Sequence, residues 1–190
     1  MFMKNIFKTS IVTIFLSSFN LYGSEKVLTD FQNPESQLTQ WQIVDDGVMG
    51  GLSKGKFKIS DSESLIFMGN ISLKNNGGFS SIRSKRTSLD LSNYKGIKIR
   101  TRGDGRNYKI RLESDSKYRR MAVSFQYEFT TVKGEWSEVF IPFEKLKASF
   151  RGWNLPNIQF NSKTIKRVGI IIADKKEGPF ELEVDWIKAS

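Results

Sequence analysis

Two glycine-rich segments, each at the edge of strand-like sequence, carry the residues best suited to binding chemistry. Residues Asp45–Gly51 read Asp-Asp-Gly-Val-Met-Gly-Gly and place two carboxylates in front of a flexible loop. Residues Arg102–Arg106 read Arg-Gly-Asp-Gly-Arg and place two arginines around a tight turn. Glycine lets a backbone or a ligand approach closely, and arginine forks match carboxylates and phosphates. A turn capped by an Asp side chain explains the first segment equally well, and a plain hairpin turn explains the second.

We predict a binding surface built from these segments and from arginines elsewhere in the chain. Its candidate residues are Asp46, Met49, Gly50, Gly51, Arg83, Arg102, Arg106 and Arg151. In this surface Asp46 organises the loop, Met49 supplies a flexible apolar contact, and the arginines bind anionic or hydroxyl-rich groups. If neighbouring strands pair, their outward faces form a second candidate, a basic platform of Arg100, Arg102, Lys109, Arg111, Ser124 and Gln126. Solvated strand faces have the same composition.

Two other patterns point to different chemistry, but less strongly. Residues Gly50–Lys56 have the glycine and lysine spacing of a phosphate-binding loop, yet Phe57 stands where Ser or Thr should bind magnesium. The residues that follow alternate as a strand, so the helix that such a loop requires is missing. Glu181, Glu183 and Asp185 offer the paired carboxylates of a glycosidase. Their alternation with apolar residues explains them as an outer strand face.

The residue types that are missing narrow the function classes further. The chain of 190 residues has no Cys and no His. This excludes Ser-His-Asp and Cys-His catalysis within the chain, zinc sites built on imidazole or thiolate, and any disulfide. A metal site could use only oxygen ligands. We expect no metal, no cofactor and no enzymatic activity.

Residues 1–24 have the features of a secretory signal peptide. Lys4 and Lys8 precede an uncharged run, Thr9–Ser24, whose 16 residues fall short of the roughly 20 that span a bilayer. We therefore expect an exported domain at 25–190, periplasmic or extracellular, with no transmembrane span in the mature chain. If the segment stays uncleaved, it anchors the protein to a membrane.

The charge of the chain is strongly basic. Loss of Lys4 and Lys8 takes the net charge from +10 to +8. A basic surface attracts anionic partners. The basic residues are spread over many strands and form no blocks of five or six, so we expect a solvated basic surface and no nucleic acid partner.

The stretch from Val27 to Ser190 indicates one all-β domain. Apolar and polar residues alternate with period two, which puts one set in a core and the other outward. The predicted strands are Lys56–Ser60, Ser64–Ser72, Gly78–Ser84, Gly96–Arg102, Asn107–Glu113, Arg119–Phe129, Trp136–Pro142, Arg167–Ala173 and Pro179–Lys188. The nearly all-apolar Val168–Ile172 predicts a central strand, and only Phe143–Lys147 resembles a helix. About ten regularly spaced strands favour a sandwich or a barrel. We expect three tryptophans in its core, Trp41, Trp136 and Trp186.

A series of short motifs, spread over almost the whole mature chain, resembles the complex I intermediate-associated protein 30 family. In order, the motifs are Trp41, Asp46–Gly51 with Ser53, Phe67 with Gly69, Asn76–Phe79 with Arg83, Arg102–Arg106 with Tyr108, Trp136, Ile141–Phe143, Arg151 with Gly152, Gly169 with Ile170, Asp174 with Lys175, Gly178–Phe180 and Asp185–Ile187. Each motif alone is weak. Their joint order is highly specific.

The resemblance implies a fold and a class of function. Members of the family look like galactose-binding-type jelly-roll β-sandwiches, and the mitochondrial member is a non-catalytic factor for assembly of NADH:ubiquinone oxidoreductase, respiratory complex I. By resemblance, the partner here is a protein, either of a respiratory complex or of the cell envelope. The alternative is an exported carbohydrate-binding module that binds glycan, with Tyr118 and Trp153 as its exposed aromatic residues. A purely structural envelope protein is a further rival.

Overall fold

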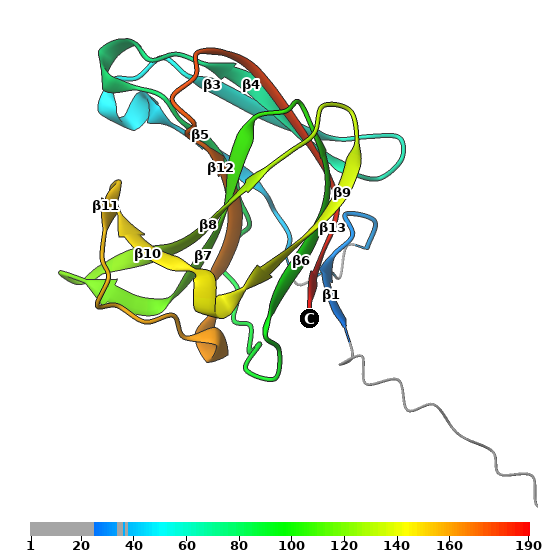
Figure 1. The fold of residues 1–190 in the computed structure, drawn as a ribbon, viewed down its shortest axis with the longest axis vertical. Coiled ribbons are helices and arrows are strands. Elements are labelled where there is room, and N and C mark those ends of the chain that lie inside the picture. The colour runs from blue at the N-terminus through cyan, green and yellow to red at the C-terminus, as the bar shows by residue number, and fades with distance from the viewer. Residues whose placement is uncertain (1–24, 34–35, 37) are drawn as a thin grey trace, which may run out of the picture.

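Two antiparallel sheets pack face to face in the computed structural model of this chain (Figure 1). The structure describes residues 25–33, 36 and 38–190, so the predicted signal peptide at 1–24 lies outside the described residues. The strands of both sheets are joined by loops and short 3₁₀ turns. The all-β sandwich predicted from the sequence is therefore confirmed.

The six-stranded sheet lies on the right in Figure 1 and has β13 at its centre. Its strands are β1 (Lys26–Thr29), β3 (Lys54–Ile59), β4 (Leu65–Ile71), β6 (Gly96–Gly103), β9 (Trp136–Pro142) and β13 (Gly178–Ala189). The order is β3-β4-β13-β6-β9, and β1 pairs with the end of β13 beyond the part that β4 covers. Every pairing is antiparallel.

The seven-stranded sheet lies on the left in Figure 1, where it is curved. Its order is β11-β10-β8-β7-β12-β5-β2. The strands are β2 (Gln42–Asp45), β5 (Ser80–Arg83), β7 (Asn107–Tyr118), β8 (Met121–Thr130), β10 (Lys147–Phe150), β11 (Trp153–Asn154) and β12 (Arg167–Ile172). The apolar β12 is an interior strand between β5 and β7, as its composition predicts. Four 3₁₀ turns complete the described elements: η1 (Asp46–Met49), η2 (Lys74–Asn76), η3 (Phe143–Lys145) and η4 (Ser162–Thr164).

The core fills the space between the two sheets and is built from alternate residues of each strand. Aromatic rings make up much of it: Phe67 and Phe180 meet edge to face with 4.8 Å between centroids, and Tyr108 lies against Phe129 at 6.2 Å. Such pairs contribute beyond the apolar area that they bury. Since the inner residues are fixed in this way, their neighbours along each strand point outward and form the two outer faces.

All nine predicted strands are present, and four short ones were missed. The missed strands are β1, β2, β10 and β11, with two to four residues each. So few positions cannot show alternation, and these strands are held by the longer partners beside them. The predicted helical stretch at Phe143–Lys147 is a 3₁₀ turn of three residues, η3.

Two of the three tryptophans predicted for the core, Trp136 and Trp186, lie outside it. A bulge between Val184 and Trp186 shifts the register of β13. As a result Ile187 takes the buried position, and Trp186 lies opposite Arg100 on β6. An extra residue in one strand reverses the sides on which all later residues point. Trp136 lies on the outer face of the six-stranded sheet and is 37% exposed. Trp41 is partly buried against the core, next to Phe31.

We expect Phe67→Ala to lower the free energy of unfolding by about 3–5 kcal/mol, because it removes a fully buried ring and leaves a cavity. Chemical denaturation measures this loss. The control is Phe140→Ala, whose ring is 42% exposed on β9 and should cost far less. Equal losses for the two variants would contradict the core described here.

Candidate functional site

The carboxylate of Asp46 is buried beneath the first glycine-rich loop and holds its backbone. Its Oδ1 accepts the N–H of Ser53 at 3.0 Å, and its Oδ2 accepts the N–H groups of Gly78 at 2.6 Å and Phe79 at 3.2 Å. Burial alone would raise the pKa of Asp46, but these hydrogen bonds outweigh it and the pKa is lowered. Asp46 therefore joins the η1 loop to the segment that enters β5.

The glycines of this loop are required by the same contact. A Cβ at Gly51 would lie 2.3 Å from Cγ of Asp46, so no side chain fits there. Gly50 has φ of 88°, in the left-handed region that glycine adopts freely. Met49 and its neighbour Val48 project from the loop and are 65% and 81% exposed. The loop thus presents two exposed apolar side chains above the backbone that Asp46 holds.

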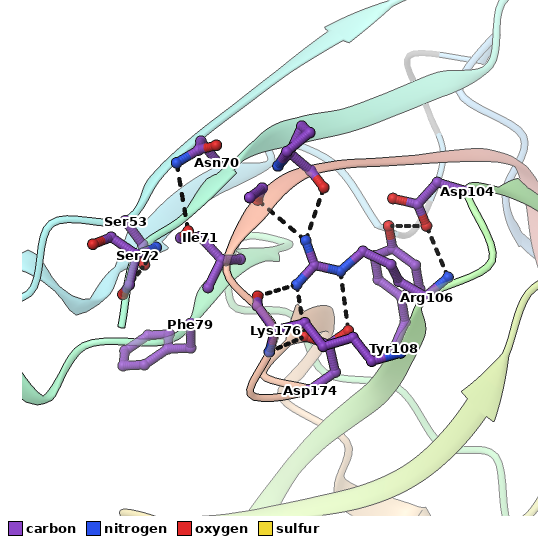
Figure 2. A network of polar contacts seen from close by, with 12 residues as sticks. Ser53, Asn70, Ile71, Ser72, Phe79, Asp104, Arg106, Tyr108, Asp174 and Lys176 are labelled. Carbon is purple, nitrogen blue, oxygen red and sulfur yellow. Dashed lines mark hydrogen bonds and ion pairs between the residues drawn. The ribbon is translucent and has the colours of Figure 1, made fainter. Parts of the chain in front are cut away.

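Arg106 lies in a polar network that joins the β6–β7 turn to the loop between β12 and β13 (Figure 2). Its guanidinium contacts both carboxylate oxygens of Asp174, at 3.0 and 2.7 Å, and donates to the carbonyls of Gly178 and Pro179. Only 11% of the Arg106 side chain and 2% of the Asp174 side chain are exposed. The hydrogen bonds that Arg106 donates to Asp174 raise the pKa of Arg106. All of these contacts lie within the protein and hold the β6–β7 turn to the loop between β12 and β13.

A second carboxylate extends this network. Asp104 accepts hydrogen bonds from the hydroxyl of Tyr108 at 3.0 Å and from the N–H groups of Arg106 and Glu181 at 3.1 and 2.8 Å. Burial raises the pKa of Tyr108, and the nearby charge of Asp104 adds to this rise. Asp104, the aspartate in the Arg-Gly-Asp-Gly-Arg turn, therefore accepts hydrogen bonds from within the protein through both of its carboxylate oxygens.

Arg102 lies on the outer face of the six-stranded sheet, where it pairs with an acidic residue and an aromatic ring. Its Nε donates to Glu183 at 3.0 Å, and its guanidinium carbon lies 5.0 Å from the ring centroid of Trp136. Arg100 pairs with Asp185 in the same way and also lies over Trp136. Two of the three carboxylates considered for glycosidase chemistry therefore each have an arginine partner on a sheet face.

The outer face of the seven-stranded sheet carries a polar and predominantly basic surface, which we call the hollow face. Buried residues alternate with those that point outward, so the strand register places the latter side by side. Its charged residues are Arg83, Lys109, Arg111, Glu113, Glu128, Lys147 and Arg167. Lys109 and Glu128 form an ion pair at 3.4 Å. Five cations thus face two anions on one surface.

Part of this face is a hollow of about 690 Å³ beside β10 and β11. Polar side chains line it, among them Lys109, Gln126, Glu128, Lys147, Ser149 and Asn154. Trp153, at the β10–β11 turn, is 76% exposed and lies between two residues of the lining, Gly152 and Asn154. Arg151 occupies the same turn with φ of 48° and lies 5.5 Å from the Phe150 ring centroid.

The predicted binding residues do not gather on one surface. Arg83 lies on the hollow face and Arg151 lies at its edge, whereas Arg102 belongs to the other sheet and Arg106 is internal. The predicted platform divides in the same manner: Lys109, Arg111, Ser124 and Gln126 share the hollow face, but Arg100 and Arg102 lie on the other sheet. Sequence reasoning did not place Glu113, Glu128, Lys147 or Arg167 on this face. The outward position of Arg167 beside apolar Val168 was the available signal.

Two further findings concern metal binding and membrane spans. Within residues 25–190 as described, no three acidic side chains form a group able to hold a metal ion. The part of the chain that the structure describes has no helix long and apolar enough to cross a membrane.

Comparison with known families identifies the relatives of the chain. A family model described as complex I intermediate-associated protein 30 (CIA30) matches residues 29–184. The mitochondrial protein of that name from Mus musculus is 28% identical over 182 residues, which are 85% of this chain and 55% of the relative. The Drosophila melanogaster protein is 28% identical over 190 residues, 87% of this chain and 62% of the relative. The chain thus spans little more than half the length of these relatives.

Solved structures share the architecture. The family 11 carbohydrate-binding module from Clostridium thermocellum, solved with a β-1,3-1,4-mixed-linked tetrasaccharide, aligns with a TM-score of 0.63 at 18% identity. The alignment covers 87% of this chain and 94% of the module. An agarase aligns with a TM-score of 0.59 at 11% identity over 88% of this chain and 25% of the enzyme. At these identities the likeness establishes the fold alone, and the predicted jelly-roll sandwich is confirmed.

The relatives also correct the predicted location. The proteins from mouse, fly and Caenorhabditis elegans are all named as mitochondrial. The prediction of an exported protein, periplasmic or extracellular, is therefore wrong, and the comparison points to mitochondria. Secretory and mitochondrial targeting segments are both basic and poor in acidic residues, so the pattern at 1–24 misled the interpretation.

We expect Asp46→Asn to lower the free energy of unfolding by about 1–3 kcal/mol at pH 7, because a neutral amide is a weaker acceptor for three N–H donors. The folded-state pKa of Asp46 lies below its unfolded value of about 3.9. Its carboxylate therefore stabilises the fold above that pH, and the contribution is lost as the pH falls through the folded pKa. Denaturation curves from pH 7 to pH 3 should show the difference from wild type shrinking at the acidic end.

The matched control is Asp61→Asn, which changes an exposed carboxylate in the β3–β4 turn. This variant should stay within about 0.5 kcal/mol of wild type at every pH. A loss for Asp46→Asn that does not change with pH would show that its charge is not what holds the loop.

Proposed function

The chain belongs to the complex I intermediate-associated protein 30 family, and we propose that it is a non-catalytic binding protein that holds an intermediate of respiratory complex I during assembly. Residues 25–190 act in this proposal as one binding domain. The proposal takes its partner from the names of the relatives. It takes its surface from the hollow face of the seven-stranded sheet.

The observation that carries the choice of surface is the hollow on the seven-stranded sheet, which lies on a predominantly basic face. On the six-stranded sheet, Arg100 and Arg102 are each paired with a carboxylate and stacked over a tryptophan. On the hollow face, the strands carry five basic and two acidic side chains, and Glu144 and Lys145 of η3 add one of each to the lining of the hollow. Such a field attracts and orients a partner of opposite charge.

The predicted binding residues divide into two roles within this proposal. Arg83 and Arg151 contact the partner, because both lie on or beside the hollow face. Met49 adds an apolar contact from the η1 loop, which lies at the upper left in Figure 1. The remaining residues hold the loops in place, namely Asp46, Gly50, Gly51, Arg102 and Arg106.

We expect the full-length chain, carrying an affinity tag, to capture complex I subunits from detergent-solubilised mitochondrial membranes. The double variant Lys109→Glu/Lys147→Glu reverses two charges of the hollow and should capture at least about tenfold less, because like charges then oppose each other across the interface. Quantitative mass spectrometry of the named subunits measures the capture.

The matched control is Lys56→Glu/Lys58→Glu, which makes the same charge change on exposed β3 of the other sheet. It should capture as wild type does. Capture of no complex I subunit, or equal capture by the two double variants, would reject the proposed partner or the proposed face respectively.

A second candidate function, glycan binding, is favoured by one observation. Trp153 presents a 76% exposed indole on β11, and its chain neighbours Gly152 and Asn154 line the polar hollow. An exposed aromatic ring can stack on a sugar. The solved family 11 module shares the fold and carries a mixed-linked tetrasaccharide.

We expect, if glycan is the ligand, that the full-length chain binds a β-1,3-1,4-mixed-linked tetrasaccharide in calorimetry. Trp153→Ala should then weaken binding about tenfold through loss of the stacking surface. The control Trp136→Ala, which changes the outer face of the other sheet, should bind as wild type does. Absence of binding by the wild-type chain would eliminate this candidate for that sugar.

A further inference from the structure

Three arginines of the hollow face surround a patch of bare backbone at Gly169. In the strand register, Gly169 lies opposite Arg83 on β5 and opposite Arg111 on β7. Arg167, two residues earlier on β12, lies opposite Glu113. A Cβ at position 169 would come within 2.7 Å of the Ile82 carbonyl oxygen and 3.1 Å of the Arg83 Cβ. Only glycine therefore leaves the floor between the arginines open.

The donors of this cluster are incompletely satisfied. Among the described residues, the buried Nε atoms of Arg83 and Arg167 have no hydrogen-bond partner. The Nε of Arg111 donates to the Ser124 hydroxyl at 2.9 Å, and burial lowers the pKa of Arg111. A buried donor without an acceptor costs free energy, which a bound oxygen atom can recover.

The charge of the cluster is also unbalanced. Glu113 is its single acidic residue, and it lies 3.4 Å from Arg167. Three guanidinium groups thus share one carboxylate, a surplus of two positive charges. Arginine keeps its proton even when burial disfavours it, so the surplus attracts an anion rather than vanishing by deprotonation.

We propose that these three arginines form a subsite for a single carboxylate, supplied by an Asp or Glu side chain of the protein partner. The pocket between them, about 20 Å³, is lined by Arg83, Arg111, Glu113, Arg167 and Gly169. That volume suits one or two atoms the size of water, which matches the end of a carboxylate and excludes a sugar ring. Planar guanidinium groups bind planar carboxylates through paired N–H bonds.

The choice of a protein carboxylate rests on the proposed function. An acidic side chain on a complex I intermediate supplies both the missing charge and the missing acceptors. Glu113 pairs with Arg167, which leaves Arg83 and Arg111 without a carboxylate partner among the described residues. A uronic acid carries the same chemical group on a glycan and is the alternative that the experiment must separate.

The test titrates the full-length chain with a capped hexaglutamate peptide and, separately, with capped hexaglutamine and with tri-galacturonate. We expect binding of hexaglutamate alone, with a shift of the Arg83 Nε–Hε signal in nuclear magnetic resonance spectra. Arg83→Gln should weaken binding about tenfold or more, since it removes a charged donor. Glu113→Gln should strengthen binding, because it removes the charge that competes with the ligand.

The control Arg86→Gln deletes the same charge from an exposed position outside the strands and should change affinity less than about twofold. Arg83→Lys keeps the charge but lacks the planar fork, and should bind at least severalfold more weakly than wild type. This conservative variant preserves the test if Arg83→Gln fails to fold.

The outcomes that overturn the subsite are equal weakening by Arg83→Gln and Arg86→Gln, weaker binding by Glu113→Gln, or binding of tri-galacturonate but not hexaglutamate. The subsite and the proposed partner can fail separately. If hexaglutamate binds with the expected order of variants but complex I subunits are not captured, the subsite stands and the partner is wrong. If subunits are captured equally by Arg83→Gln and wild type, the partner stands and the subsite is not used.

Discussion

The ion pair between Arg106 and Asp174 holds the sandwich together at one end. Arg106 begins the approach to β7 and Asp174 follows β12, both of the seven-stranded sheet. The same guanidinium binds carbonyls at the start of β13, the central strand of the six-stranded sheet. A buried pair of this kind is costly unless its remaining donors and acceptors are also used. Here they are used, so the pair fixes how one sheet meets the other at this end.

Much of the fold could be predicted because the long strands alternate cleanly. β6, β7, β8 and β12 were all located from period-two patterns or apolar runs. The bulge in β13 could not be foreseen from the sequence. The amino-acid composition of Phe180–Ala189 does not reveal a bulge, and the bulge moves Trp186 out of the core. Two-residue β11 carries too little pattern to be recognised alone.

The candidate site was harder to predict than the fold, because the same residue type has different roles. The sequence alone does not distinguish the roles of Arg83, Arg102 and Arg106. Arg102 has a partner on a neighbouring strand, Arg106 has one across a loop, and the buried Nε of Arg83 has none among the described residues. The partners are 68 to 81 positions away in the chain, so only the strand order reveals which arginine remains available for a ligand.

The central place of β13 has a consequence for how the chain acquires its structure. β13 is the last described strand in chain order, yet it pairs with β1, β4 and β6. Until it has left the ribosome, β1 has no partner and the β3–β4 hairpin cannot join β6. The six-stranded sheet therefore assembles only after synthesis of its final strand, and the earlier strands expose unpaired edges meanwhile. Formation of this sheet thus waits for β13 and cannot proceed strand by strand from β1.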